Sequence, residues 1–315
     1  MSGMADIEPV GRRHEREAIR FVVGGGRRDA LTEARAEVLR DAVGLRGPGA
    51  VRLWWARHRR KCAAAAMIIE SPGKTGMLLH SPAAATGVDG EALRDLLSAI
   101  SADALAGGLS MVQSLLEAAA EADVATIRAA GFQPLAELIY LRRALTRPAA
   151  PPAQEQLAFL AFRSAGEFRE GELAEVISST YEGSLDCPAL SAVREVDDVI
   201  KGHKHTGVFS PECWWIADRG GDPAGCILVN DSTAGASVEV VYMGVAPAHR
   251  GRGLGRAMIR HAAEVERQRG RKSMTLAVDS RNAYAMAVYK AEGFQETDRR
   301  LAHAMLRIAP AEGSR

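Results

Sequence analysis

The stretch from Val240 to Ala263 constrains the fold of this chain more than any other part of it. An apolar run over Val240–Val245 predicts a buried strand, and Pro247 marks the turn that ends it. A loop of arginine and glycine follows, and a segment with the apolar spacing of a helix comes directly after it. The rest of the chain has to fit around this succession of strand, turn, loop and helix.

The loop, Arg250–Gly255, has the chemistry of a phosphate site. Its glycines let the backbone approach a ligand closely and point successive N–H groups at one spot. The helix that follows adds its positive N-terminal end, so a phosphate fits there. Arg250, Arg252 and Arg256 add positive charge that suits a diphosphate. The alternative is a Gly/Arg-rich surface turn.

Two common phosphate loops do not match this stretch. The dinucleotide fingerprint G-x-G-x-x-G requires a small residue where this chain has Arg256 or Met258. A P-loop requires Lys and then Ser or Thr after its last glycine, whereas Gly255 is followed by Arg256 and Ala257.

The pattern that fits is R-x-x-G-x-G over Arg250–Gly255, preceded by V-x-P over Val245–Pro247. It resembles the acetyl-CoA motif of the GCN5-related N-acetyltransferases (GNAT). The likeness extends over about residues 157–309, because Asn282–Tyr289 followed by Gly293-Phe294 resembles the family's N-x-x-A-x-x-x-Y…G-F signature. The resemblance implies acetyl-CoA as co-substrate, no metal, and a diphosphate held by Arg250, Gly251, Arg252, Gly253, Leu254, Gly255 and Arg256.

The resemblance also implies roles for two residues of the next helix. Asn282 would bind the pantetheine or phosphate arm, and Tyr289 would donate a proton to the leaving thiolate. They are seven residues apart, so two helical turns put them on one face. Structural roles remain open for both: a helix N-cap for Asn282 and core packing for Tyr289.

The reaction needs a neutral amine, because an ammonium has no lone pair, so a base must take its proton. Glu239, at the start of the motif strand, is the best candidate, and burial would raise its pKa toward neutrality. Asp279, at the end of the next strand, is the rival, and an exposed edge carboxylate is the alternative for Glu239. The resemblance implies oxyanion donors at Met243, Gly244 and Val245, where the family's strand bulges and splays from its neighbour; Gly244 fits such a bulge.

The acceptor depends on the loop Tyr181–Pro188, which corresponds to the family's variable substrate loop. We expect Tyr181, Glu182 and Asp186 to line the acceptor site, and the two carboxylates suit a cationic amine; an ordinary solvated loop is the alternative. A primary amine of a small molecule is the expected acceptor. A protein N-terminus competes with it, a longer acyl chain than acetyl stays open, and a non-catalytic acyl-CoA sensor is the alternative to an enzyme.

The 315 residues suit two domains of ~150 each. Prolines at 148, 151 and 152 predict a linker over residues 148–156, between a domain over 1–147 and the catalytic domain over 157–315. The halves resemble each other: Ala130-Gly-Phe-Gln133 echoes Glu292-Gly-Phe-Gln295. This self-similarity suggests a duplicated domain, with two unrelated α/β domains as the alternative.

The first half differs where the loop belongs. It has Ser81–Glu91 there, without an arginine, and Asp89 and Glu91 would repel phosphate. We therefore expect two tandem GNAT-like α/β domains, each a mixed sheet with helices on both faces, of which the first is degenerate. The plan is similar in architecture to that of the mycothiol synthases. In the first half, Ala18–Val23 is predicted as a short strand.

Composition excludes several partners. The formal net charge of +1 argues against nucleic acid or a membrane surface. The four cysteines lack zinc spacing and are expected as free thiols. No apolar run approaches the ~20 residues of a membrane span, and no signal core is present, so we expect a cytoplasmic protein. The oligomeric state stays open.

Overall fold

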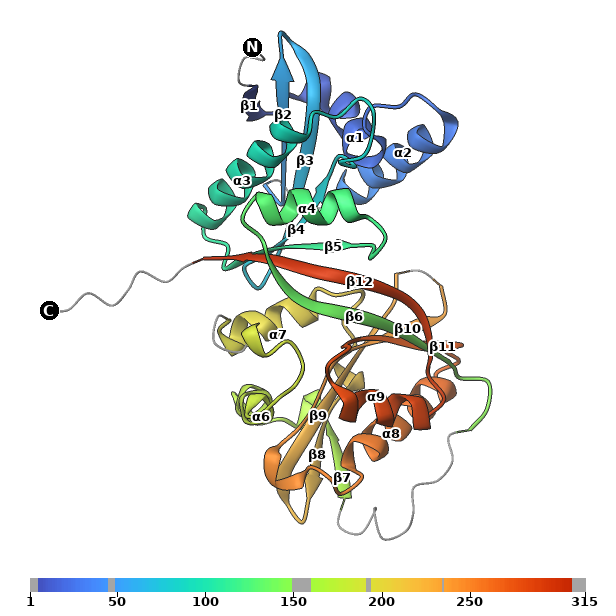
Figure 1. Cartoon of the computed structure of the whole chain (residues 1–315). Helices are drawn as coiled ribbons and strands as arrows, with labels where there is room; N and C mark the ends of the chain where they lie inside the picture. Colours follow the sequence, from blue (N-terminus) through green and yellow to red (C-terminus); the bar gives the residue numbers. More distant parts are fainter. Residues whose placement is uncertain (1–4, 45–48, 149–159, 191–193, 234, 308–315) are drawn as a thin grey trace, which may run out of the picture. The chain divides into compact units, whose positions relative to one another are not determined.

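The computed structural model describes residues 5–44, 49–148, 160–190, 194–233 and 235–307. Its internal contacts divide the chain into two compact units. Unit 1 contains Met1–Leu135 and Leu301–Arg315, and unit 2 contains Ala136–Arg300. Each unit is a mixed sheet between two layers of helices, as the sequence predicts (Figure 1).

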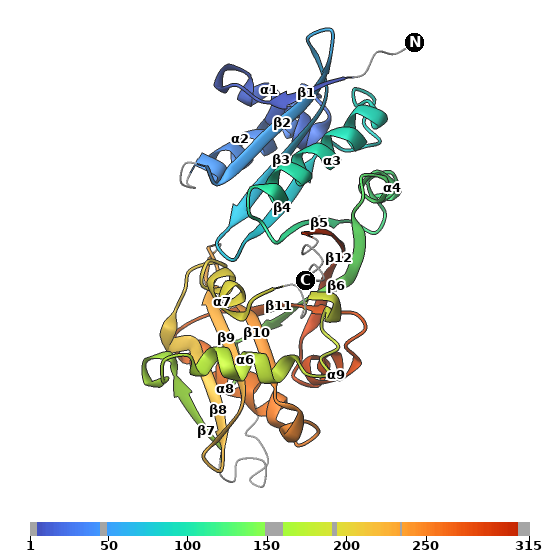
Figure 2. The same ribbon diagram turned by 90° about the vertical axis from the view of Figure 1, so that its left-hand side faces the viewer.

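Unit 1 has the strand order β1-β2-β3-β4-β5-β12, in which β4 and β5 are parallel and the other pairs are antiparallel. Helices α1 and α2 pack on one face of this sheet, and α3 and α4 pack on the other (Figure 2). Its elements are β1 (Asp6–Pro9), α1 (Glu15–Gly24), α2 (Ala30–Gly44), β2 (Val51–His58), β3 (Lys61–Ser71), β4 (Thr75–His80), α3 (Gly90–Ala106), β5 (Met111–Leu116), α4 (Glu121–Ala129) and the second half of β12 (Gln295–Leu306).

Unit 2 has the order β12-β6-β11-β10-β9-β8-β7, with β10 and β11 parallel. Helices α6 and α7 cover one face, and α8 and α9 cover the other. Its elements are β6 (Gln133–Ala144), β7 (Leu160–Ser164), α6 (Glu172–Tyr181), α7 (Val196–Lys204), β8 (Trp214–Arg219), β9 (Asp222–Asp231), β10 (Ser237–Val245), α8 (Leu254–Gln268), β11 (Ser273–Asp279), α9 (Ala283–Ala291) and the first half of β12.

One element differs in type from the sequence prediction. The expected strand Ala18–Val23 is part of helix α1. Ala18, Ile19 and Val22 are buried at helical spacing against β3, while Glu15 and Glu17 charge the first turn. A short apolar run does not distinguish a strand from a buried helix face, and here the flanking charges belonged to the helix.

The last strand of each sequence half joins the unit of the other half. The second part of β6 pairs with β11 from Leu138 to Ala144, and Leu301–Leu306 of β12 pairs with β5. The domain limits predicted from the sequence, residues 147 and 157, divide the chain into two consecutive halves. The compact units divide it differently, because each unit includes the last strand of the other half. Apart from Pro148, the predicted linker 148–156 lies outside the described residues.

The two units repeat one arrangement at corresponding places. In unit 1, the parallel strands β4 and β5 pair only over Thr75–Met77 and Met111–Gln113, and a loop then leads from β4 into α3. In unit 2, β10 and β11 pair only over Ser237–Glu239 and Ser273–Thr275, and a loop leads from β10 into α8. This correspondence supports the duplication.

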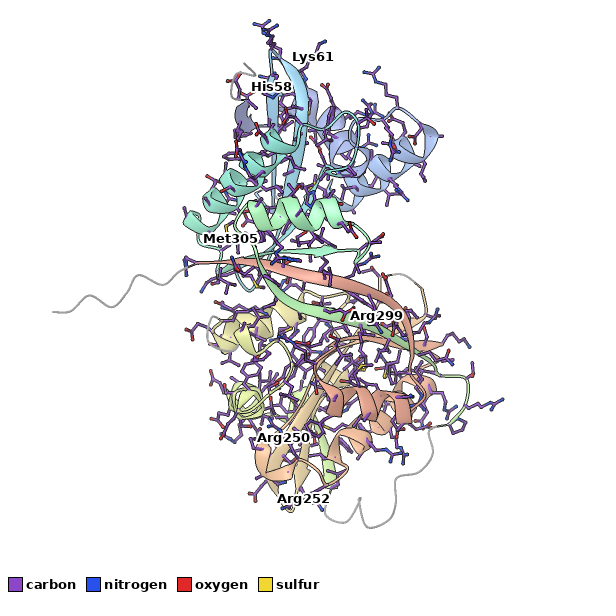
Figure 3. All side chains as sticks on the ribbon, in the orientation of Figure 1. His58, Lys61, Arg250, Arg252, Arg299 and Met305 are labelled. Atoms are coloured by element: carbon purple, nitrogen blue, oxygen red, sulfur yellow. The ribbon has the colours of Figure 1, made fainter. Side chains whose placement is uncertain are left out.

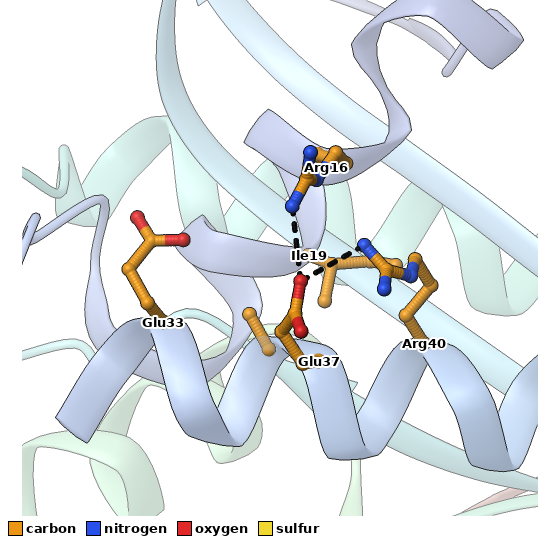
Figure 4. A pocket seen from close by; sticks show the side chains of 6 residues that line it. Arg16, Ile19, Glu33, Glu37 and Arg40 are labelled. Atoms are coloured by element: carbon orange, nitrogen blue, oxygen red, sulfur yellow. Dashed lines mark hydrogen bonds and ion pairs between the residues drawn. The ribbon is translucent and has the colours of Figure 1, made fainter. Parts of the chain in front are cut away.

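Two smaller features complete the fold. A cavity of about 10 Å³ between α1 and α2 is room for about one water. Its wall carries the ion pair Arg16–Glu37 (2.9 Å), which joins the two helices, and the pair Arg40–Glu37 (3.3 Å) within α2 (Figure 4). In the part of the chain that is described, no helix is both long and apolar enough to cross a membrane.

Candidate functional site

The start of α8 has two glycines in the left-handed region and no capping side chain. Gly253 is its N-cap, with φ of 78°, and Gly251 has φ of 73°, both in the left-handed region that favours glycine. No side chain caps the helix, so its first N–H groups keep no partner from a capping side chain. Leu254 is buried in the core and anchors this first turn. Such a helix start suits a phosphate.

The three arginines expected on a diphosphate lie in different surroundings; Figure 3 labels two of them, Arg250 and Arg252. The Arg250 guanidinium donates to the carbonyl oxygens of Val245 (3.0 Å), Thr180 (2.9 Å) and Gly183 (3.3 Å), which ties the loop to the end of α6. Arg256 Nε donates to the buried carboxylate of Glu292 at 2.9 Å. Arg252 is exposed and makes no polar contact with any residue the structure describes. It alone is free to meet an incoming anion without breaking an existing contact.

The strand β10 parts from β11 after Glu239, although it continues to Val245. The edge of Met243, Gly244 and Val245 that faces β11 therefore has no strand partner. This is the splay that the family resemblance implies, and it leaves backbone groups able to bind an extended ligand.

The bulge does not lie where it was expected. The register of β10 against β9 shifts between Val240 and Tyr242, so the extra residue is Val241 and not Gly244. A Cβ on Gly244 would stand 2.5 Å from Thr180 Oγ1 and 2.6 Å from Thr180 Cβ. Gly244 is therefore small because α6 passes directly over it.

Glu239 lies on the α6–α7 face of the sheet. Its neighbours Val238 and Val240 belong to the core under α8, so Glu239 points to the opposite face, with its cross-strand partners Asn230 and Thr275. The side chain is half-buried, and burial raises the pKa of its carboxyl. Among the described residues it has no hydrogen-bond partner. A raised pKa suits a base that works near neutrality.

The rival base, Asp279, is fully buried and fully engaged. Its carboxylate accepts hydrogen bonds from the Arg281 guanidinium (2.5 Å) and from the backbone N–H groups of Cys187 (3.2 Å) and Arg281 (3.0 Å). Burial works against its charge, but these bonds, led by Arg281, keep the pKa of Asp279 lowered. This environment supports Glu239 as the base.

Asn282 and Tyr289 both have the structural roles left open by the sequence. The Asn282 side chain accepts from Ala285 N at 3.1 Å and caps α9. Tyr289 is 6% exposed and packs against Phe294, with ring centroids 5.6 Å apart. Burial, with a smaller effect of the Asp186 charge, raises the pKa of the Tyr289 phenol, so it stays protonated as a donor must. Their roles toward a cofactor stay predictions.

The substrate loop is tied to the end of β11. Asp186 Oδ1 accepts from Asp279 N at 3.1 Å, and Cys187 takes φ of 43° where its N–H bonds Asp279. Asp186 is exposed as a residue, yet protein atoms around its carboxylate raise its pKa. Glu182 is exposed at the end of α6, and Tyr181 stands edge-on to Tyr242 at 6.1 Å.

Three residues of this face escaped sequence reasoning. Tyr242 OH and Thr180 Oγ1 are 2.5 Å apart, and the His203 ring lies 5.6 Å from the Tyr242 ring. Burial, then the Arg194 charge, lowers the pKa of His203 to about 4. In a regular strand Tyr242 would face away from Glu239, and only the bulge at Val241 turns it to the same side. No local signal in the sequence indicates that bulge.

The corresponding place in unit 1 is filled by the protein itself. Asp89 caps α3 by accepting from Ala92 N at 3.0 Å, and it lies 3.2 Å from Nε2 of His58, which Figure 3 labels. The bond from Ala92 leads the interactions that lower the pKa of Asp89. A carboxylate thus occupies the helix start that a phosphate would need. Within the described ranges, no group of three or more His, Cys, Asp or Glu side chains could hold a metal ion.

Comparisons with known proteins agree with this geometry. Residues 181–294 match the model of the acetyltransferase (GNAT) family. Streptothricin acetyltransferase of Streptomyces lavendulae is 40% identical over 74 residues, covering 24% of this chain and 39% of the relative. Mycothiol acetyltransferase of Tsukamurella paurometabola is 31% identical over 150 residues, covering 40% of this chain and 50% of the relative. The chain thus spans half or less of these relatives' length.

Solved structures share the fold over nearly the whole chain. A GCN5-related N-acetyltransferase from Sphaerobacter thermophilus has a TM-score of 0.60 at 18% identity and covers 96% of each chain. A tandem GNAT protein from the clavulanic acid biosynthesis pathway has a TM-score of 0.51 at 16% identity and covers 98% of this chain and 100% of its own. The chain thus shares the fold of these GCN5-related N-acetyltransferases, and the match to the acetyltransferase family model lies within its second unit.

Proposed function

We propose that unit 2 transfers the acetyl group of acetyl-CoA to a primary amine of a small molecule by direct transfer. The observation that carries this is one strand, β10: its end leads to the uncapped start of α8, and its other end bears the unpaired Glu239. An anion site and a base thus flank one gap in the sheet. Relatives named for streptothricin and mycothiol support a small-molecule acceptor.

Each part of acetyl-CoA has a counterpart in the chain. The backbone of Gly251 to Gly255 and the Arg252 side chain would hold the diphosphate. The pantetheine would run along the unpaired edge of β10 as an added strand. Backbone N–H groups at Met243–Val245 would then donate to the thioester oxygen as it becomes negative.

Two side chains, Glu239 and Tyr289, would move the protons of this reaction. Glu239 takes a proton from the ammonium, directly or through a water, and frees the lone pair. The amine nitrogen bonds to the thioester carbon, and the carbon–sulfur bond breaks. The amine loses two protons in all: one leaves to solvent through Glu239, and the other matches the proton that Tyr289 gives to the thiolate.

The test is release of free thiol from acetyl-CoA in the presence of spermidine, glucosamine, streptothricin or a peptide with a free N-terminus, with mass spectrometry of the product. Glu239→Gln should lower kcat by roughly 100-fold, the usual scale of general-base catalysis. Glu175→Gln, an exposed carboxylate of the same unit, is the matched control and should leave kcat unchanged. Acetylation of the peptide alone would instead indicate an N-terminal acetyltransferase, and binding without any product would indicate a sensor.

A further inference from the structure

The exchanged strand β6 places Tyr140, a residue of the first sequence half, on the same face of the sheet as Glu239, two strands away. Tyr140 pairs with Ala277 of β11, and Glu239 pairs with Thr275 of the same strand. Residues two apart on a strand share a face, and paired residues share it too. Tyr140 and Glu239 therefore lie on one face of the sheet. The neighbours of Tyr140, Ile139 and Leu141, are in the core on the opposite face.

Both side chains have polar groups without a protein partner. The Tyr140 hydroxyl and the Glu239 carboxylate make no hydrogen bond to any of the described residues, although both side chains are half-buried. Neither polar group is among the buried atoms that lack a partner, so both are open to solvent and can exchange water for a polar group of a ligand. Two such groups on one face of the sheet offer a place where a polar ligand can bind.

Burial and nearby charges change the pKa of the Tyr140 phenol. Burial raises its pKa, and the negative charge of Glu239 raises it further, whereas Arg300 of β12 acts in the opposite direction and Asp298 adds to the rise. The phenol therefore stays protonated at neutral pH and can donate a hydrogen bond. A donor next to a base is the pair of groups that an acceptor with a hydroxyl or carbonyl beside its amine would meet.

We propose that Tyr140 binds the acceptor: its hydroxyl hydrogen-bonds a polar group of the substrate and holds the amine at Glu239. This rests on the proposed function and deepens it. The acceptor site of unit 2 is then completed by a strand from the first half of the chain. The acceptors that fit are amines with a hydrogen-bonding group close to the nitrogen, such as aminosugars, in preference to plain alkyl polyamines.

The kinetic test compares Tyr140→Phe with Tyr284→Phe, which removes an equivalent hydroxyl from an 80% exposed tyrosine of the same unit. With the amine acetylated best among spermidine, glucosamine and streptothricin, Tyr140→Phe should raise KM for the amine roughly 5- to 10-fold, the scale of one lost hydrogen bond. KM for acetyl-CoA should not change. An active enzyme in which both variants behave alike overturns this inference alone; an enzyme that acetylates nothing overturns the proposed function as well.

Whether Tyr140 lies near Glu239 can also be tested without measuring enzyme activity. The carbon next to each phenol oxygen is labelled with ¹³C, and the five tyrosines of the full chain are followed by NMR from about pH 4 to pH 8. The Tyr140 signal, identified by its loss in Tyr140→Phe, should shift as Glu239 ionises. In Glu239→Gln that shift should disappear. A Tyr140 signal that titrates identically in both proteins would show the two groups to be apart and overturn the inference.

Discussion

At the scale of the residue, surroundings separate side chains of the same kind. Glu239 and Asp279 are both carboxylates on neighbouring strands, but only Asp279 has Arg281 and backbone donors around it. Glu239 has burial without compensation, and its pKa moves the other way. The type of residue therefore indicated two candidate bases, and the opposite shifts of their pKa favour Glu239 for the proposed role.

A buried histidine gives unit 2 a dependence on acid. His261 stacks on Phe162 at 3.9 Å and stands edge-on to Trp215 at 5.0 Å, and burial lowers its pKa to about 4. The unfolded chain, with a histidine pKa of about 6.5, then binds the proton more readily than the folded one. This contribution to stability is complete above about pH 6.5 and decreases as pH falls toward 4.

The expected loss from His261 at pH 5 is about 2 kcal/mol relative to pH 7.5. His203, whose pKa is also lowered to about 4, adds a similar loss, and burial lowers the pKa of His303 as well, so His261→Phe should remove a part of the dependence. Urea unfolding of the full chain at the two pH values measures it. His205→Phe, at an exposed position, is the control. Equal pH dependence in all three proteins would contradict the assignment.

At the scale of the element, the strand β10 meets a helix on each side of its end. Two glycines are needed here for different reasons: Gly244, in the strand, gives room to α6, and Gly253, after the strand, starts α8 in a left-handed conformation. The sequence pattern predicted the second role. The first requires α6 to be in place, which the local sequence does not determine.

Gly244→Ala tests the contact between β10 and α6. The added carbon would overlap Thr180, so the strand or helix must shift, at a cost of about 1–3 kcal/mol. Gly166→Ala, where an added carbon meets nothing within 4 Å, should be nearly neutral. Thermal melting of both variants decides; a Gly244→Ala protein as stable as the wild type would mean that the two elements pack less closely than described.

Gly253→Asp tests the anion site. A carboxylate there would reproduce in unit 2 what Asp89 does in unit 1, and it should lower acetyl-CoA affinity by at least roughly 100-fold through charge repulsion. Gly220→Asp, at a positive-φ glycine in open space on the β8–β9 hairpin, is the control. Calorimetric titration with acetyl-CoA measures both. Unchanged affinity in Gly253→Asp would remove the basis of the proposed function.

At the scale of the whole molecule, the exchange of β6 and β12 makes the two halves of the chain depend on each other. β6 lies between β12 and β11 in unit 2, and its backbone bonds β11 over seven residue pairs. A chain that begins at Leu157 lacks this central strand and should expose the edge of β11 and aggregate. A chain that begins at Gln133 retains it and should remain monodisperse by gel filtration. Equal behaviour of the two would contradict a structural need for β6.

Local patterns determined most of the elements and the nature of the motif. The apolar run Val240–Val245 and the helical spacing after the loop predicted β10 and α8, and the Arg/Gly loop predicted a helix start suited to an anion, whereas the strand expected over Ala18–Val23 is part of helix α1. These features depend on backbone preferences and on spacing within one segment, which the sequence carries directly.

Only the tertiary structure decided the rest. The exchange of strands, the bulge that turns Tyr242 toward Glu239, and the partners of Arg250 and Arg256 arise from hydrogen bonds between segments far apart in the chain. Register and pairing depend on the whole sheet, since a shift of one residue reverses every side chain. By itself, the sequence therefore determined that a glycine-rich helix start follows β10; the packing decided which side chains surround it.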